Sequence, residues 1–393
     1  MSNALSPALG ARQQATLPFY AGTMFTFLAA SGAPTPLYRL YHEMWGASSV
    51  MLTAVFSVYV VFLLGALLTV GKLSDYIGRR PAVFAALVIE SLAMASFVAA
   101  RSVEALIVAR AVQGIATGLA TASLAAAILD ADKQKGPMVN SLTPLLGMAT
   151  GNLAAGALAT YAPHPLQMTY ALLLAVFIVQ AGLIWSVPET VTPQPGAWAS
   201  LRPRLAVPKL ARRALVLTAP SNIATWAWGG FYLSLMPSLV REVLGVGSAL
   251  LSCLVVSVLM FSGSTAIFAF RTRTARQALL IGTSAMIAGV VILLAGVAGR
   301  NLAVMAIGSV IGGFGFGAGF LGSLRAVMPL AQAHERAGLM AVYYVESYLV
   351  FCIPAVAAGF IAAAIGLVPT IEIYGAAVVA LALVGLGTSR RLA

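Results

Sequence analysis

Long apolar runs, separated by short polar connections, recur from one end of the chain to the other. A helix that crosses a bilayer needs about 20 mainly apolar residues. Runs of that length lie near 17–40, 49–70, 81–100, 104–128, 138–161, 166–187, 214–240, 248–270, 277–298, 301–324, 338–364 and 369–388. The pattern predicts an all-α integral membrane protein with twelve transmembrane helices.

The longest polar interruption, residues 188–213, divides these runs into two sets of six and is rich in proline and basic residues. Paired bundles of spans are a common plan among transporters. The sequence therefore predicts an N-terminal six-helix bundle over 1–187, a cytoplasmic central loop over 188–213 and a C-terminal six-helix bundle over 214–393.

The composition agrees with a membrane protein, since 60% of the residues are hydrophobic and only 9% are charged, against about 25% charged in soluble domains. The net charge of +12 does not indicate nucleic acid, because the chain offers no soluble domain to carry a basic face. Loops on the expected inner side hold 18 of the 23 Lys and Arg residues, and outer loops hold four. This bias predicts a multi-pass protein of the cell membrane, the inner membrane in a bacterium, with both termini cytoplasmic.

The chain lacks the side-chain groupings of an enzyme. Cys253 and Cys352 lie within apolar runs and the three histidines are scattered, so we expect no disulfide and no metal site. No nucleophile–base pair and no G-x-x-x-x-G-K-[ST] phosphate loop occur in the sequence. We therefore expect neither an enzyme nor an ATP-driven pump, and no cofactor.

The stretch GKLSDYIGRR, after the second run, gathers charge in a chain that otherwise avoids it. Gly71 permits close helix approach, Gly78 permits a tight turn, and Asp75 can accept charge-assisted hydrogen bonds. The stretch resembles the signature loop of the major facilitator superfamily, G-x-L-[AS]-D-[RK]-x-G-[RK]-[RK], and departs from it at one position. The resemblance implies the twelve-helix major facilitator fold and a cytoplasmic gate in which Asp75, Arg79 and Arg80 latch the two halves. The alternative is a plain basic anchor that only sets orientation.

Two further stretches carry part of the same resemblance. LIVARAVQGIATG in the fourth run resembles the family's R-x-x-Q-G pattern through Arg110 and Gln113, and the resemblance implies a part in proton coupling for Arg110. GMATGNLAAG in the fifth run resembles the glycine pattern of the proton-driven exporters, but Asn152 replaces its proline. The same glycine spacing is also a common device for helix packing.

Acidic residues within spans are costly and mark candidate functional sites. Glu346 lies about 13 Å into its span at 1.5 Å per residue, near the bilayer midplane, where it could load and release a proton. A protonated Glu346 bonded to Tyr or Ser in a purely structural role is the alternative. Glu90 lies at a depth similar to that of Arg110, so we expect these two charges to pair, either structurally or in coupling.

The resemblance places a substrate site at mid-membrane, lined by the first, fourth, seventh and tenth spans. Asn222 and Trp226 are four residues apart and therefore lie on one helical face. Few fixed charges lie in these spans, which favours a neutral, cationic or weakly amphipathic small molecule. The candidate substrate-binding residues are Asn222, Trp226, Tyr232, Gln113, Tyr343 and Thr26.

The sequence thus favours a secondary active transporter resembling the twelve-span drug:proton antiporters, which moves a small organic molecule by proton-coupled efflux. A proton-coupled symporter for a nutrient such as a sugar or organic acid would look similar. A non-transporting membrane sensor is the third possibility. We expect a monomer whose partners are the substrate, protons and the lipid bilayer.

Overall fold

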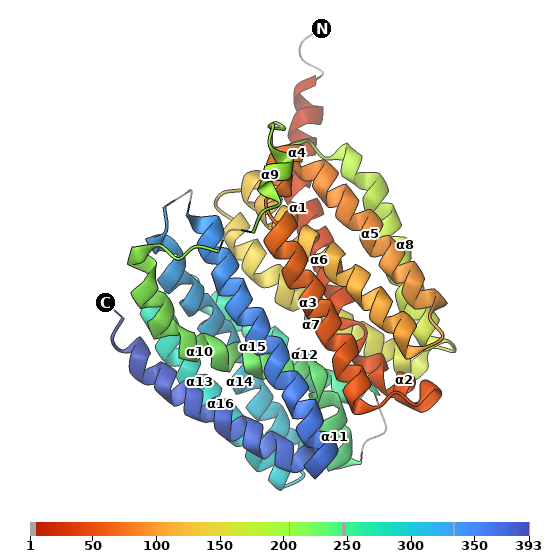
Figure 1. Ribbon diagram of the computed structural model, residues 1–393, viewed down its shortest axis with the longest axis vertical. Coiled ribbons are helices and arrows are strands. Elements are labelled where there is room, and N and C mark those ends of the chain that lie inside the picture. The colour runs from red at the N-terminus through yellow and green to blue at the C-terminus, as the bar shows by residue number, and fades with distance from the viewer. Residues whose placement is uncertain (1–4, 204, 246–248, 333–334, 393) are drawn as a thin grey trace. The chain divides into compact units, whose positions relative to one another are not determined.

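The computed structural model describes residues 5–203, 205–245, 249–332 and 335–392, and every regular element in these ranges is helical (Figure 1). The long helices are α1 (Leu5–Gly32), α3 (Ser49–Val70), α5 (Arg79–Ala99), α6 (Val103–Ala131), α7 (Gly136–Tyr161), α8 (Pro165–Leu183), α10 (Lys209–Ser234), α12 (Ala249–Ala269), α13 (Ala275–Ala298), α14 (Leu302–Val327), α15 (Arg336–Ile365) and α16 (Leu367–Ser389). The short ones are α2 (Tyr38–Trp45), α4 (Leu73–Ile77), α9 (Ala197–Ser200) and α11 (Met236–Leu244), with 3-10 turns at Thr35–Leu37, Ile184–Ser186 and Met328–Leu330.

Each of the expected spans overlaps one long helix, which confirms the predicted fold class. The expected spans 17–40 and 214–240 extend too far, since α1 ends at Gly32 and α10 at Ser234, and their last residues belong to α2 and α11. Ten helices in the described part of the chain are long and apolar enough to cross a membrane by composition alone. The other two long helices, α1 and α10, are of spanning length but richer in polar residues. The first turns of α10, for example, carry Lys209, Arg212 and Arg213.

The helices begin and end where local chemistry favours it. Both α2 and α11 are followed by a glycine in the left-handed conformation, Gly46 with φ 66° and Gly245 with φ 65°, the usual helix C-terminal signal. Thr274 and Gln277 form a capping box at the start of α13. The Asn301 side chain caps α14. These caps satisfy amide groups that a bilayer would leave without partners.

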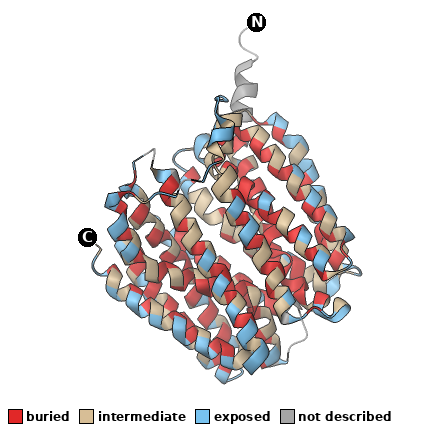
Figure 2. Cartoon of the chain, in the orientation of Figure 1, coloured by how far each residue is buried: buried red, intermediate tan, exposed pale blue. Residues whose placement is uncertain are grey.

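The chain divides into two compact units. Unit 1 comprises 1–31, 58–151 and 163–203, and unit 2 comprises 32–57, 152–162 and 204–393. Exposed positions occur along the helices of both units (Figure 2). Many of them carry large apolar side chains, among them Leu92, which is 59% exposed, and Phe360, which is 54% exposed. Exposed apolar side chains in this number are unfavourable in water and are accommodated by the lipid chains of a bilayer.

Glycines on α14 allow the tightest packing in unit 2. A Cβ atom at Gly317 would collide with the backbone of Gly263 on α12, and one at Gly315 would collide with Met286 on α13. Small residues let helix backbones approach closely in membranes. The glycine-rich sequence of α14 therefore serves packing within unit 2.

Candidate functional site

The signature loop of unit 1 turns sharply at Gly78, between α4 and α5. Its backbone angles, φ 99° and ψ 155°, fall in a region that is essentially open to glycine only. A Cβ atom there would also lie 2.7 Å from Glu189 Oε2. The turn therefore requires glycine both for its conformation and for the room it leaves to Glu189.

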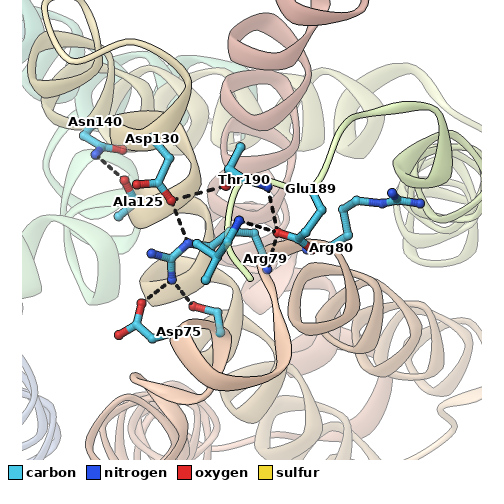
Figure 3. Close-up of polar contacts among 10 residues, drawn as sticks. Asp75, Arg79, Arg80, Ala125, Asp130, Asn140, Glu189 and Thr190 are labelled. Carbon is cyan, nitrogen blue, oxygen red and sulfur yellow. Dashed lines mark hydrogen bonds and ion pairs between the residues drawn. The ribbon is translucent and has the colours of Figure 1, made fainter. Parts of the chain in front are cut away.

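Arg79, the first residue of α5, is the centre of the loop's polar network (Figure 3). Its Nε donates to Asp130 Oδ2 at 2.9 Å and its Nη1 donates to Ser74 Oγ at 2.7 Å. Nη1 also forms an ion pair with Asp75. The side chain is only 8% exposed, and two carboxylates compensate its charge, as a largely buried cation requires.

Glu189 caps the start of α5 from the far end of unit 1's sequence. Its Oε1 accepts the backbone N–H of Arg79 and its Oε2 accepts that of Arg80, each at 2.9 Å. A carboxylate in this position accepts hydrogen bonds from backbone N–H groups that have no partner within the helix, and its negative charge interacts favourably with the positive end of the helix dipole. The Arg80 guanidinium lies 5.1 Å from the centre of the Trp185 ring.

Within the motif, Asp75 and Arg79 form an ion pair, Gly78 makes the turn between α4 and α5, and Arg80 follows Arg79 on α5. Gly71 directly follows α3, and a Cβ added there would collide with Leu67 O and stand 3.7 Å from Ala122 Cβ on α6. Every contact described for this network falls within unit 1, so a latch between two halves stays a prediction. Sequence reasoning missed the roles of Glu189 and Asp130, because no local pattern marks side chains that meet Arg79 from 110 and 51 positions away.

A second polar cluster is buried inside unit 1. Gln113 Nε2 donates to Glu90 Oε1 and to Ala30 O, both at 3.1 Å, and Gln113 Oε1 accepts from Arg110 Nη1 at 2.7 Å. The Arg110 guanidinium lies 4.8 Å from the centre of the Tyr59 ring. The cluster therefore ties together α1, α3, α5 and α6.

The expected direct pair of Glu90 and Arg110 is absent from the ion pairs of the described residues. The Gln113 amide lies between the two side chains instead, because Gln113 follows Arg110 by one turn of α6. Gln113, a predicted substrate-binding residue, is 0% exposed. Its side chain serves this network.

In unit 2, Glu346 on α15 meets Asn222 on α10. Asn222 Nδ2 donates to Glu346 Oε1 at 3.3 Å and to Ser347 Oγ at 3.1 Å. The Tyr343 hydroxyl donates to Asn222 Oδ1 at 2.9 Å. No Lys or Arg of the described ranges forms an ion pair with Glu346. Three of the candidate residues, Glu346, Asn222 and Tyr343, therefore form one hydrogen-bonded group.

Aromatic side chains adjoin this group one turn further along α10. The Trp226 ring lies 5.5 Å from Tyr348, 5.9 Å from Phe320 and from Phe351, and 6.3 Å from Phe316, measured between ring centres. Tilted and edge-to-face arrangements at these distances are favourable. An acid and an aromatic cluster thus occupy neighbouring positions on α10 and α15.

The other two candidates lie elsewhere. Tyr232 is fully buried and its hydroxyl is 2.8 Å from Ser309 Oγ on α14, so it packs between helices of unit 2. Thr26 on α1 donates to Gly22 O and accepts from Gln180 Nε2 on α8, both at 2.9 Å, within unit 1. Among the residues that the structure describes, no three His, Cys, Asp or Glu side chains could hold a metal ion.

Comparison with known proteins gives consistent matches. The family model described as Major Facilitator Superfamily matches residues 19–355. The multidrug resistance protein MdtL of Klebsiella pneumoniae strain 342 is 27% identical over 296 residues, which cover 70% of this chain and 71% of that protein.

Solved structures agree at the level of the fold. A variant of the nucleoside transporter NupG has a TM-score of 0.74 at 11% identity, over 95% of this chain and 99% of that one. A bacterial homologue of the human lysosomal transporter Spinster, inward-facing and unoccupied, has a TM-score of 0.75 at 13% identity, over 97% and 98%. Identities this low establish a shared fold and nothing about substrate.

Proposed function

The chain belongs to the major facilitator superfamily of membrane transporters, and from that premise we propose that it exports a small organic molecule in exchange for protons. Transport proceeds by alternating access between two six-helix bundles joined by the loop 188–213. The protein works as a monomer in the cell membrane, the inner membrane of a bacterium, with both termini cytoplasmic. The similarity to a multidrug resistance protein supports the outward direction.

The observation that carries the proposal is the placement of Glu346 against Asn222. A carboxylate at this depth is costly unless a proton or a cation compensates it. Asn222 supplies only a neutral hydrogen-bond donor, which leaves the negative charge of an ionised Glu346 without a cation beside it. In one state of the cycle a proton therefore neutralises Glu346, and in another state the substrate or water stabilises its carboxylate. Tyr343 orients the Asn222 amide by donating to its oxygen.

Trp226 and its aromatic neighbours supply the apolar surface beside this acid. Aromatic faces bind neutral rings by stacking and cations through their quadrupole. This supports the substrate class favoured by the sequence, a neutral, cationic or weakly amphipathic molecule. Asn222, Trp226 and Tyr343 are therefore assigned to substrate binding, and Glu346 to coupling.

The cluster in unit 1 is assigned a supporting part in coupling. The Gln113 side-chain amide donates to Glu90 and accepts from Arg110. A change in the protonation of Glu90 therefore alters the hydrogen bonding of Arg110 through this one amide. In the signature loop, Asp75, Arg79 and Arg80 are assigned to the cytoplasmic gate.

The test uses everted membrane vesicles whose acidified interior is followed with a pH-sensitive dye. Antibiotics, dyes, sugars, amino acids and organic acids are added in turn. At least one compound should dissipate the gradient with the wild-type protein and not with Glu346→Gln. The matched control is Glu372→Gln, because Glu372 lies in unit 2 on α16 and is exposed, and it should behave like the wild type.

Two outcomes contradict the proposal. If no compound releases protons, efflux by proton exchange is wrong, and uptake of labelled nutrients into intact cells tests the symporter. If Glu346→Gln couples as well as the wild type, the assigned role of Glu346 is wrong although the protein transports.

A further inference from the structure

Five exposed arginines gather where α13 begins and α16 ends. Arg271 and Arg273 lie in the connection between α12 and α13, Arg276 lies in the first turn of α13, and Arg390 and Arg391 follow α16. Arg276 Nη2 donates to Arg390 O at 3.2 Å, which joins the two segments, and α13 and α16 lie side by side (Figure 1). We call these five residues the arginine patch.

No acid compensates this charge. The sequence from 249 to 332 and from 373 to 393 contains no Asp or Glu. None of the five arginines forms an ion pair within the part of the chain that the structure describes. The patch therefore holds five positive charges on adjoining segments, which repel one another and attract an anion.

Arg325 on α14 fixes the backbone that carries the patch. Its guanidinium donates to the carbonyl oxygens of Phe270, Arg271 and Arg273 at 2.8–3.1 Å. These bonds hold the connection in place and occupy carbonyl groups that would otherwise repel an anion. The arginines are thus displayed on a fixed loop, so that less conformational entropy is lost when a ligand binds.

Apolar surface continues directly from the charge. The Arg271 guanidinium lies 4.1 Å from the centre of the Phe268 ring, and Phe268 itself is 46% exposed. Further along α13 and α16, Ile281, Leu383 and Val384 are exposed as well. A soluble anion uses only the charged part of such a surface, whereas a phospholipid uses both parts.

From this combination we infer that the arginine patch is a binding site for the headgroup of an anionic phospholipid, with its acyl chains against the exposed apolar residues beside it. The chemistry recognised is a phosphate oxyanion, for which arginine is suited because its planar guanidinium donates two hydrogen bonds side by side. All five basic residues are arginines. The site lies apart from the Glu346 group and does not depend on the transported molecule.

The experiment measures binding of phosphatidylglycerol to the purified full-length protein in a neutral detergent, by native mass spectrometry with phosphatidylcholine as reference lipid. The variant Arg271→Gln/Arg273→Gln/Arg276→Gln should bind phosphatidylglycerol on the order of a hundredfold more weakly, from the loss of three basic residues. The matched control, Lys133→Gln/Lys135→Gln/Arg202→Gln, removes three exposed charges from unit 1 and should keep the wild-type affinity.

A second variant, Arg390→Gln/Arg391→Gln, changes only residues beyond α16 and should also weaken binding. It keeps the test decisive if the triple variant fails to fold. Equal losses in the patch variants and the unit 1 control would show a diffuse electrostatic effect and overturn the site. Unchanged binding in both patch variants would overturn it as well. Glycerol 3-phosphate is also tested as a competitor. If it displaces phosphatidylglycerol as effectively as the lipid itself does, the site binds a soluble phosphate ester and our assignment is refuted.

Discussion

Replacing Gly78 by alanine should destabilise unit 1 through two separable effects. The first is conformational, because the backbone angles of Gly78 are open essentially to glycine and strain of this kind costs on the order of 1–3 kcal/mol. The second is the loss of the Glu189 cap, because the new Cβ would stand 2.7 Å from Glu189 Oε2. A helix cap contributes about 0.5–2 kcal/mol.

The two effects can be separated with a double-mutant cycle. Gly78→Ala should cost about 2–4 kcal/mol from strain and cap together. Glu189→Ala should cost only the cap, about 1 kcal/mol. Each single variant loses the cap, but the double variant can lose it only once. The sum of the two single losses in unfolding free energy should therefore exceed the loss in the double variant by about 1 kcal/mol.

The assay is thermal unfolding of the purified variants in one detergent, where each kcal/mol moves Tm by roughly 2 °C in a large chain. Gly182→Ala on α8 is the matched control, because an added Cβ there meets no atom within 4 Å, and its Tm should not fall. Strict additivity of Gly78→Ala and Glu189→Ala would refute the reasoning, since it would mean that the turn and the carboxylate act independently.

Three further outcomes are expected. Asp75→Asn should reach the membrane in normal amounts but transport more slowly, because it weakens the charge at the Arg79 network; unchanged flux in vesicles would remove Asp75 from the gate. Tyr232→Phe should lower stability by about 1 kcal/mol through a lost buried hydrogen bond while substrate affinity stays the same, and a raised KM would instead place Tyr232 in the substrate site. Backbone amides after Asp132 bond its carboxylate and lower its pKa, so this turn is stabilised above the unfolded-state pKa and loses that contribution as pH falls through the folded-state pKa. Asp132→Ala should speed hydrogen exchange of these amides at neutral pH, and equal exchange rates would contradict this.

The sequence by itself determined the class and the fold of this protein. Runs of about 20 apolar residues can satisfy their backbone in a bilayer only as helices, so length and hydropathy predicted all twelve long helices, although the ends of the first and seventh were placed too late. The GKLSDYIGRR stretch pointed to the family because its glycines and charges stand at fixed spacing within ten consecutive residues. A pattern of this kind involves consecutive residues only and can be recognised from the sequence without the tertiary structure.

Only the tertiary structure decided which side chains meet. Glu189 caps a helix that begins 110 positions earlier, and Gln113 takes the place between Glu90 and Arg110. The meeting of Asn222 with Glu346 joins residues 124 positions apart. The rotation of each helix about its axis sets these contacts, and that rotation follows from how glycines and bulky residues of several helices pack together. Hydropathy does not encode this rotation, because a spanning helix carries apolar residues on every face and no single face is marked as the buried one.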